Sequence, residues 1–157
     1  MQNYWQNHYL NRKLLKHRFW RRLYSRLGPR YARWNVGDLN FVLDVADQGG
    51  VSKQILRDGS FEKFNEEVVD AELNKNHFSR DVALDIGANI GYWSVVLSRH
   101  LGFGQVYAFE PEPHSYKLLT QNLTLNNLNH VVKTFPIALG EQHGESTLTI
   151  STSNQCA

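Results

Sequence analysis

The stretch from Val82 to Glu110 constrains the fold of this chain more than any other part of its sequence. A short apolar run over residues 82–86 leads into a turn with two glycines, after which apolar side chains recur at helical spacing. A second apolar run over residues 105–109 follows and ends at an acid. A strand, a glycine-rich turn, a helix and a second strand form the opening of a βαβ unit. The sequence therefore predicts an α/β fold with a parallel sheet.

Two acids flank this unit and indicate the chemistry of its ligand. Asp85 lies directly before the turn, and Glu110 follows 25 positions later, close to the offset of about 20 residues at which an acid reaches ribose hydroxyls. A dinucleotide site needs G-x-G-x-x-G, whereas this turn reads D-x-G-x-N-x-G. A carboxylate before the turn suits a ligand with a positive pole, such as the sulfonium of S-adenosylmethionine. A nicotinamide-dependent oxidoreductase is therefore the least favoured interpretation.

The same residues resemble a known family. Residues 84–94, with the sequence LDIGANIGYWS, resemble the first motif of the FkbM-type S-adenosylmethionine-dependent methyltransferases, and VYAFEP at 106–111 resembles their second-strand motif. The similarity extends from about residue 37 to about residue 150. It implies a Rossmann-like class I methyltransferase sheet and the family's cofactor, S-adenosylmethionine.

The resemblance also implies roles for individual residues. It suggests methyl transfer to a hydroxyl group of a small molecule or a sugar, with the catalytic residues and the acceptor left unassigned. The residues that it places at the cofactor are Asp85 near the methionine end, Gly87, Ala88, Asn89 and Gly91 in the turn, Glu110 on the ribose hydroxyls, Pro111 beside the adenine, and Ile137 and Ala138 flanking the adenine. Trp93 and Phe109 are expected in the core instead.

Charge divides the chain unevenly. Residues 1–37 hold nine basic and no acidic residues, whereas the rest holds eight basic and 15 acidic residues. We therefore expect a basic amphipathic extension at residues 1–36 (the basic segment), whose helix ends near Gly28-Pro29, and a methyltransferase domain at 37–157. The basic segment could contact nucleic acid or an anionic membrane, act as a targeting presequence, or pack on the domain with its arginines solvated.

Other elements follow from local patterns. Alternating apolar residues predict a strand at 39–45, and a short helical pattern predicts a helix at 51–57. Ser60 is the expected N-cap of a longer helix, with Phe61, Phe64, Val68 and Ala71 on one face. Beyond the βαβ unit we expect a strand at 131–138 and a hairpin from Gly140 into 146–150.

The resemblance calls for further strands that this sequence does not contain, so the sheet is expected to be incomplete at its C-terminal end. The outer edge of the strand at 82–86 would then be open to pairing, and catalysis by this chain alone is in doubt. The alternative function is a noncatalytic or degenerate cofactor-binding module whose basic segment contacts an anionic partner.

Several patterns are missing from the sequence. No run approaches the ~18 apolar residues of a membrane-spanning helix, and the start does not resemble a secretory signal. The single cysteine, Cys156, and the spacing of the histidines predict no metal site. We therefore expect a cytoplasmic chain, and we discount the sequon at Asn122 because it lies in a helical pattern.

Overall fold

The computed structural model describes residues 30–47, 50–142, 144–145 and 147–149. The contacts divide the chain after Phe61, and each part is described by itself. The helix expected before Gly28 lies outside the described residues. None of the helices in the described part of the chain combines the length and hydropathy needed to cross a bilayer.

The first part is a β-hairpin followed by a helix. Strand β1 (Tyr31–Val36) pairs antiparallel with β2 (Leu39–Asp44), and α3 (Val51–Asp58) follows. The helix confirms the prediction at 51–57, with one further residue. The strand β1 was not predicted, since its residues were assigned to the end of the basic segment, after its expected helix. Its alternating buried residues, Ala32, Trp34 and Val36, are the signal that was overlooked.

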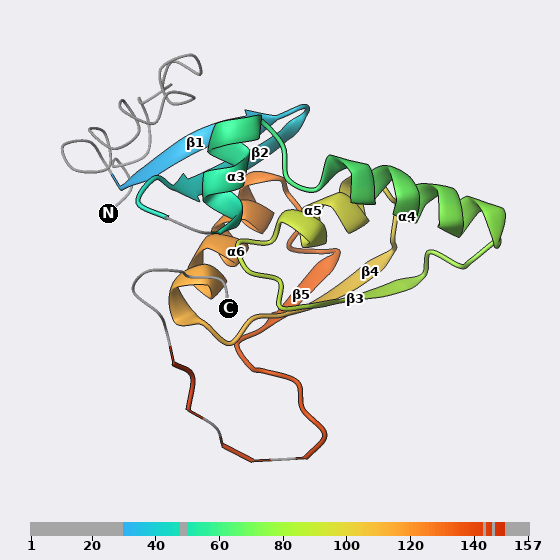
Figure 1. The fold of residues 1–157 in the computed structure, drawn as a ribbon. Helices are drawn as coiled ribbons and strands as arrows, with labels where there is room; N and C mark the ends of the chain where they lie inside the picture. Colours follow the sequence, from blue (N-terminus) through green and yellow to red (C-terminus); the bar gives the residue numbers. More distant parts are fainter. Residues whose placement is uncertain (1–29, 48–49, 143, 146, 150–157) are drawn as a thin grey trace. The chain divides into compact units, whose positions relative to one another are not determined.

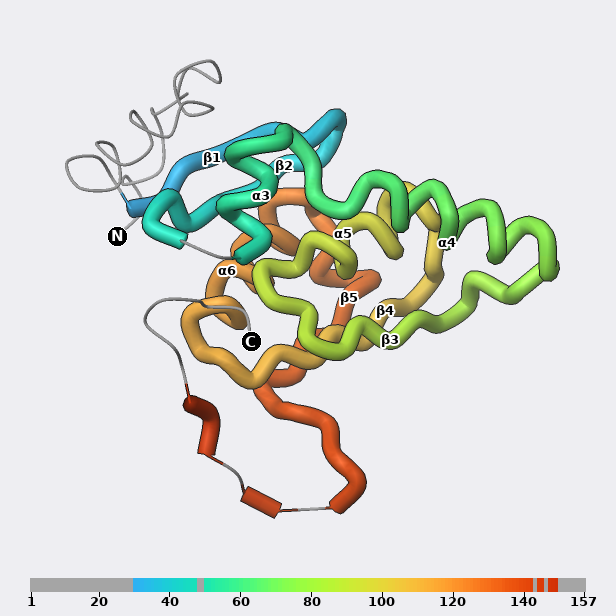
Figure 2. Tube along the Cα trace, viewed as in Figure 1, coloured from blue at the N-terminus to red at the C-terminus, as the bar shows by residue number. Residues whose placement is uncertain are grey.

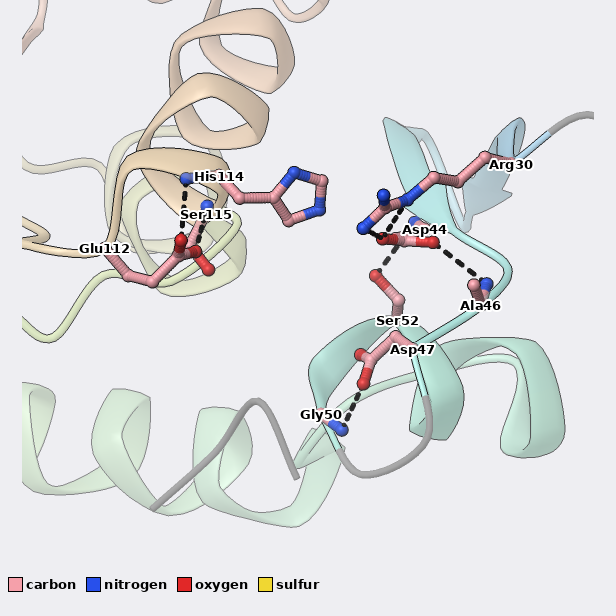
Figure 3. A network of polar contacts seen from close by, with 9 residues as sticks. All are labelled: Arg30, Asp44, Ala46, Asp47, Gly50, Ser52, Glu112, His114 and Ser115. Carbon is pink, nitrogen blue, oxygen red and sulfur yellow. Dashed lines mark hydrogen bonds and ion pairs between the residues drawn. The ribbon is translucent and has the colours of Figure 1, made fainter. Parts of the chain in front are cut away.

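A carboxylate at the end of β2 holds the hairpin to the following chain (Figure 3). Asp44 is 2% exposed, and it pairs with Arg30 at 2.9 Å and accepts a hydrogen bond from the backbone N–H of Ala46 at 2.9 Å. The backbone N–H of Asp44 donates to Ser52 Oγ in α3 at 3.1 Å. These contacts fix where the chain leaves β2 and enters α3.

The second part is a three-stranded parallel sheet with helices. Its sheet has the order β3-β4-β5, and Ala83, Val106 and Val132 share one register position. Figure 1 shows α5 and α6 on the same side of this sheet. The elements in chain order are α4 (Lys63–Lys75), β3 (Val82–Ile86), α5 (Tyr92–Arg99), β4 (Gln105–Phe109), α6 (Pro113–Leu125) and β5 (Val132–Phe135).

The two faces of the sheet differ in burial. The helix-covered face contributes Val106 and Ala108, both 0% exposed, to a core completed by apolar residues of α5 and α6. On the opposite face Val82, Leu84 and Ile86 of β3 are 55%, 59% and 62% exposed; we call these three residues the open face. Among the described residues β3 pairs with β4 alone, and the open edge stays a prediction.

The helix α4 corrects two expectations. It begins at Lys63 after Glu62, which has a φ of 45°, so Ser60 is not its N-cap. No residue of α4 is buried, and Phe64 is 75% exposed, so the predicted apolar face does not pack into the core of the described structure. Polar contacts hold the helix instead, because Arg80 pairs with Asp70 at 2.9 Å.

The chain after β5 also differs from prediction. The strand ends at Phe135 rather than at residue 138, because Pro136 follows and proline cannot donate to a strand ladder. The predicted hairpin over 140–150 does not form within the described residues of that stretch. Figure 2 shows this segment leaving the sheet as an extended loop.

Candidate functional site

The glycine turn (residues 87–91) lies where β3 ends and is bonded to the end of β4. The backbone N–H groups of Gly87 and Ala88 both donate to Phe109 O, at 2.9 and 3.0 Å. Three of the five residues have positive φ values, which are 79° at Gly87, 50° at Asn89 and 82° at Gly91. Left-handed backbone favours glycine and tolerates asparagine, so the sequence G-A-N-I-G matches the conformation that the turn adopts.

Glu110 closes the turn from the side of β4. Its backbone N–H donates to Phe135 O at 3.0 Å, which fixes the residue at the carboxyl end of the sheet. Its side chain is buried, and Oε2 accepts from the N–H of Asn89 at 2.7 Å while Oε1 accepts from the N–H of Glu112 at 2.8 Å. A carboxylate has about four lone-pair sites, so each oxygen retains capacity for another donor.

Asp85 occupies the end of β3 on the face covered by α5. Ser94 Oγ, which is fully buried in the first turn of α5, donates to Asp85 Oδ2 at 2.5 Å. Burial raises the pKa of Asp85 above its ordinary value, the hydrogen bonds from Ser94 oppose this rise, and nearby Glu110 adds to it. These surroundings therefore stabilise the ionised form of Asp85 less than water does.

The helix α6 supports the turn from beneath. Asn122 Nδ2 donates to Ile90 O at 2.8 Å, and Leu119 packs directly against Gly91. The helix itself is capped by Glu112, whose carboxylate accepts from the backbone N–H groups of His114 at 2.9 Å and Ser115 at 2.6 Å (Figure 3).

The structure brings most of the predicted site residues together. Those gathered around the turn are Asp85, Gly87, Ala88, Asn89, Gly91 and Glu110, with half-buried Pro111 next in the chain. Ile137 and Ala138 lie instead in the exposed segment after β5, and their contact with adenine stays a prediction. Trp93 and Phe109 are half-buried rather than central to the core, and Trp93 Nε1 donates to Glu62 at 3.0 Å.

Sequence reasoning overlooked two residues that shape the site. Ser94 and Asn122 are polar, yet each stands on the apolar face of its helix and is 0% exposed. A polar side chain within an apolar helical stripe is the signal that could have identified them, because burial of a polar group requires a hydrogen-bond partner.

Comparisons with known proteins place this part of the chain. Residues 60–145 match the family model described as the TRM5/TYW2 methyltransferase domain. Methyltransferase sdnD of Sordaria araneosa is 37% identical over 79 residues, which are 50% of this chain and 29% of that protein. The tRNA(Phe) (4-demethylwyosine(37)-C(7)) aminocarboxypropyltransferase of Methanocaldococcus jannaschii is 38% identical over 52 residues, 33% of this chain and 21% of that protein. The chain thus spans less than a third of either curated relative.

A solved structure agrees on the fold. The structure of P. horikoshii TYW2 in complex with MeSAdo has a TM-score of 0.52 at 20% identity, covering 78% of this chain and 48% of that chain. This likeness confirms the predicted α/β fold. The matching family model confirms the broader prediction of an S-adenosylmethionine-dependent methyltransferase family and does not support the FkbM type specifically. The chain belongs to the TRM5/TYW2 methyltransferase domain family.

Proposed function

We propose that the glycine turn and Glu110 bind S-adenosylmethionine. The observation that carries this proposal is the geometry of Glu110, whose two oxygens are aimed by backbone N–H groups at the end of the sheet and retain acceptor capacity for two ribose hydroxyls. A Cβ built on Gly87 would meet nothing within 4 Å. A ligand can therefore approach the backbone closely at that glycine.

Asp85 supports the same assignment through its charge. A carboxylate whose pKa is raised by burial gains stability from a nearby cation. The methionine end of the cofactor carries an ammonium and a sulfonium, so it complements Asp85, while a pyrophosphate would be repelled. The role of Asp85 is to orient this end and not to exchange protons with it.

We further propose that the whole protein is a methyltransferase. When bound, S-adenosylmethionine supplies an activated methyl group on sulfur, so the protein has chiefly to orient the acceptor and exclude water. The chain's own residues then bind and align the cofactor. No residue is assigned to acid–base chemistry.

We favour an RNA nucleoside as the acceptor. The matching family model and the M. jannaschii relative, which is named for tRNA(Phe), support this choice. The nine basic residues before Asp38 would suit an anionic partner. A hydroxyl of a small molecule or sugar is the second candidate, and it is favoured by the FkbM-like motifs at residues 84–94 and 106–111.

Calorimetry with S-adenosylmethionine and S-adenosylhomocysteine tests cofactor binding. We expect Glu110→Ala and Asp85→Ala each to weaken binding by about tenfold or more, because ~1.4 kcal/mol of lost interaction corresponds to that factor. Glu67→Ala, on the exposed part of α4, is the matched control and should leave the affinity unchanged. A folded wild-type chain that binds neither compound would contradict the proposal, as would unchanged affinity in both site variants.

The acceptor is tested separately. Binding of fluorescent tRNA should weaken steeply with salt, and Arg21→Gln combined with Arg22→Gln should reduce the slope of that dependence by about two. Transfer of labelled methyl groups to tRNA, compared with transfer to hydroxyl-bearing small molecules and sugars, then separates the two acceptor candidates. Salt-independent binding of tRNA would argue against a role for the basic segment.

A further inference from the structure

Asn122 is a buried amide in a place where the helix pattern calls for an apolar side chain. It is 0% exposed on α6, between Leu119 and Leu123, which are also buried. Burying an amide costs free energy unless it is hydrogen-bonded. Here Nδ2 donates at 2.8 Å to Ile90 O, which lies 32 residues away in sequence, in the glycine turn.

The position of Ile90 makes this bond important for the shape of the turn. Ile90 lies between Asn89 and Gly91, which both have left-handed φ values. The carbonyl of Ile90 and the N–H of Gly91 belong to one planar peptide group, so fixing the carbonyl also fixes that N–H. The N–H of Gly91 donates to Ala88 O at 2.7 Å, which closes the turn.

Two side chains therefore hold the turn from two different elements. Glu110, after β4, accepts the N–H of Asn89, and Asn122, on α6, donates to the carbonyl of the next residue. The first bond belongs to the proposed cofactor site. The second approaches the turn from the helix beneath it and leaves the space beside Gly87 unobstructed.

We propose that Asn122 is a positioning residue for cofactor binding, acting through the peptide group between Ile90 and Gly91. This inference rests on the proposed binding of S-adenosylmethionine at the turn. Asn122 itself touches no cofactor. Its amide keeps the backbone of residues 89–91 in the conformation that receives the ligand. Removal of the amide should therefore reduce the free energy of cofactor binding by more than it reduces the free energy of unfolding.

The same helix offers a matched control. Asn126 lies one turn further along and is 6% exposed, and its Nδ2 donates at 2.8 Å to Asn122 O, within the helical segment rather than to the turn. Asn126→Leu removes another buried amide, at the C-cap of the same helix. Asn122→Asp serves as a second variant of nearly unchanged volume, in case Asn122→Leu does not fold.

The experiment measures the dissociation constant for S-adenosylhomocysteine, thermal stability and amide hydrogen exchange in the full chain and its three variants. We expect Asn122→Leu and Asn122→Asp to weaken binding about tenfold and to accelerate exchange at Asn89 and Gly91. We expect Asn126→Leu to lower the melting temperature with an unchanged dissociation constant. Equal dissociation constants in the Asn122 and Asn126 variants would overturn the inference alone, whereas a folded wild type without binding would overturn it together with the proposed function.

Discussion

Leu119 of α6 lies so close to Gly91 that a Cβ built on the glycine would meet Leu119 Cδ1 at 2.6 Å and its Cα at 3.4 Å. Real Cβ atoms do not approach other heavy atoms as closely as the shorter distance. The glycine therefore permits both the left-handed turn, at a φ of 82°, and the close approach of the supporting helix.

Gly91→Ala should consequently destabilise the chain by about 2–5 kcal/mol, since left-handed backbone costs about 1–2 kcal/mol and overpacking about 1–3 kcal/mol. Gly87→Ala is the matched control, because its φ of 79° is similar but a Cβ there meets nothing within 4 Å. Gly87→Ala should lower the free energy of unfolding by only about 1–2 kcal/mol, which is the cost of left-handed backbone for a residue with a Cβ. Urea unfolding of both variants measures the difference, and equal losses would show that Leu119 yields without cost.

Asp85→Asn should stabilise the folded chain at neutral pH while weakening binding of S-adenosylmethionine. Burial raises the pKa of Asp85 above the ordinary 3.8, so the folded state holds its proton more tightly than the unfolded state does. Stability therefore falls as the pH rises from about 3.8 through the raised pKa of the folded state. Asparagine is uncharged and still accepts from Ser94, so it avoids this loss.

The pH dependence of the melting temperature tests the explanation. The advantage of Asp85→Asn over the wild type should be present at pH 7 and shrink as the pH approaches 3.8 from above. Glu67→Gln, on exposed α4, controls for the removal of one acidic group from the chain. A stabilisation by Asp85→Asn that is the same at pH 4 and pH 7 would refute the linkage.

The sequence predicted the βαβ unit almost to the residue because its signals are local. Strand β4 was predicted at 105–109 and is observed at Gln105–Phe109, since an apolar run is bounded there by glycine and by an acid. The turn and Glu110 could be placed for the same reason. Their identities report the backbone conformation and the edge of the sheet directly.

The parts that were not predicted depend on tertiary contacts. The strand β1 carries Arg33 within its alternating pattern, and its pairing with β2 is settled only when the hairpin forms. The apolar spacing in α4 predicted packing that the described structure does not provide. Polar contacts are found instead, from Arg80 to Asp70 in the helix and from Trp93 to Glu62 at its N-cap. Ser94 and Asn122 acquire their roles only through partners at the end of β3 and in the glycine turn.

The two faces of the sheet should differ in how much stability is lost when an apolar side chain is replaced by threonine. Leu84→Thr on the open face should alter stability by less than about 0.5 kcal/mol, because its side chain is already 59% exposed. Val106→Thr on the neighbouring strand should cost about 1–3 kcal/mol, because Val106 is 0% exposed and the new hydroxyl would be buried. Urea unfolding compares them, and a large loss for Leu84→Thr would mean that this face is covered in solution.

Glu112→Ala should destabilise the chain by about 1 kcal/mol, the usual value of an N-cap. Burial raises the pKa of Glu112, but hydrogen bonds from the N–H groups of His114 and Ser115 lower it by more, so the pKa lies below its ordinary 4.5. The contribution of the cap is therefore complete above pH 4.5 and is lost as the pH falls through the lowered value of the folded state.

Melting temperatures of the wild type and of Glu112→Ala should accordingly converge on acidification below pH 4.5. Glu112→Gln keeps an acceptor oxygen for the helix N-terminus but has no charge, so it should lose less stability than the alanine variant at pH 7. Because the pKa values of Glu112 and Asp85 shift in opposite directions, acidification should weaken the first contribution and relieve the second. A difference between wild type and Glu112→Ala that persists undiminished below the folded-state pKa would mean that the carboxylate does not act as a charged cap.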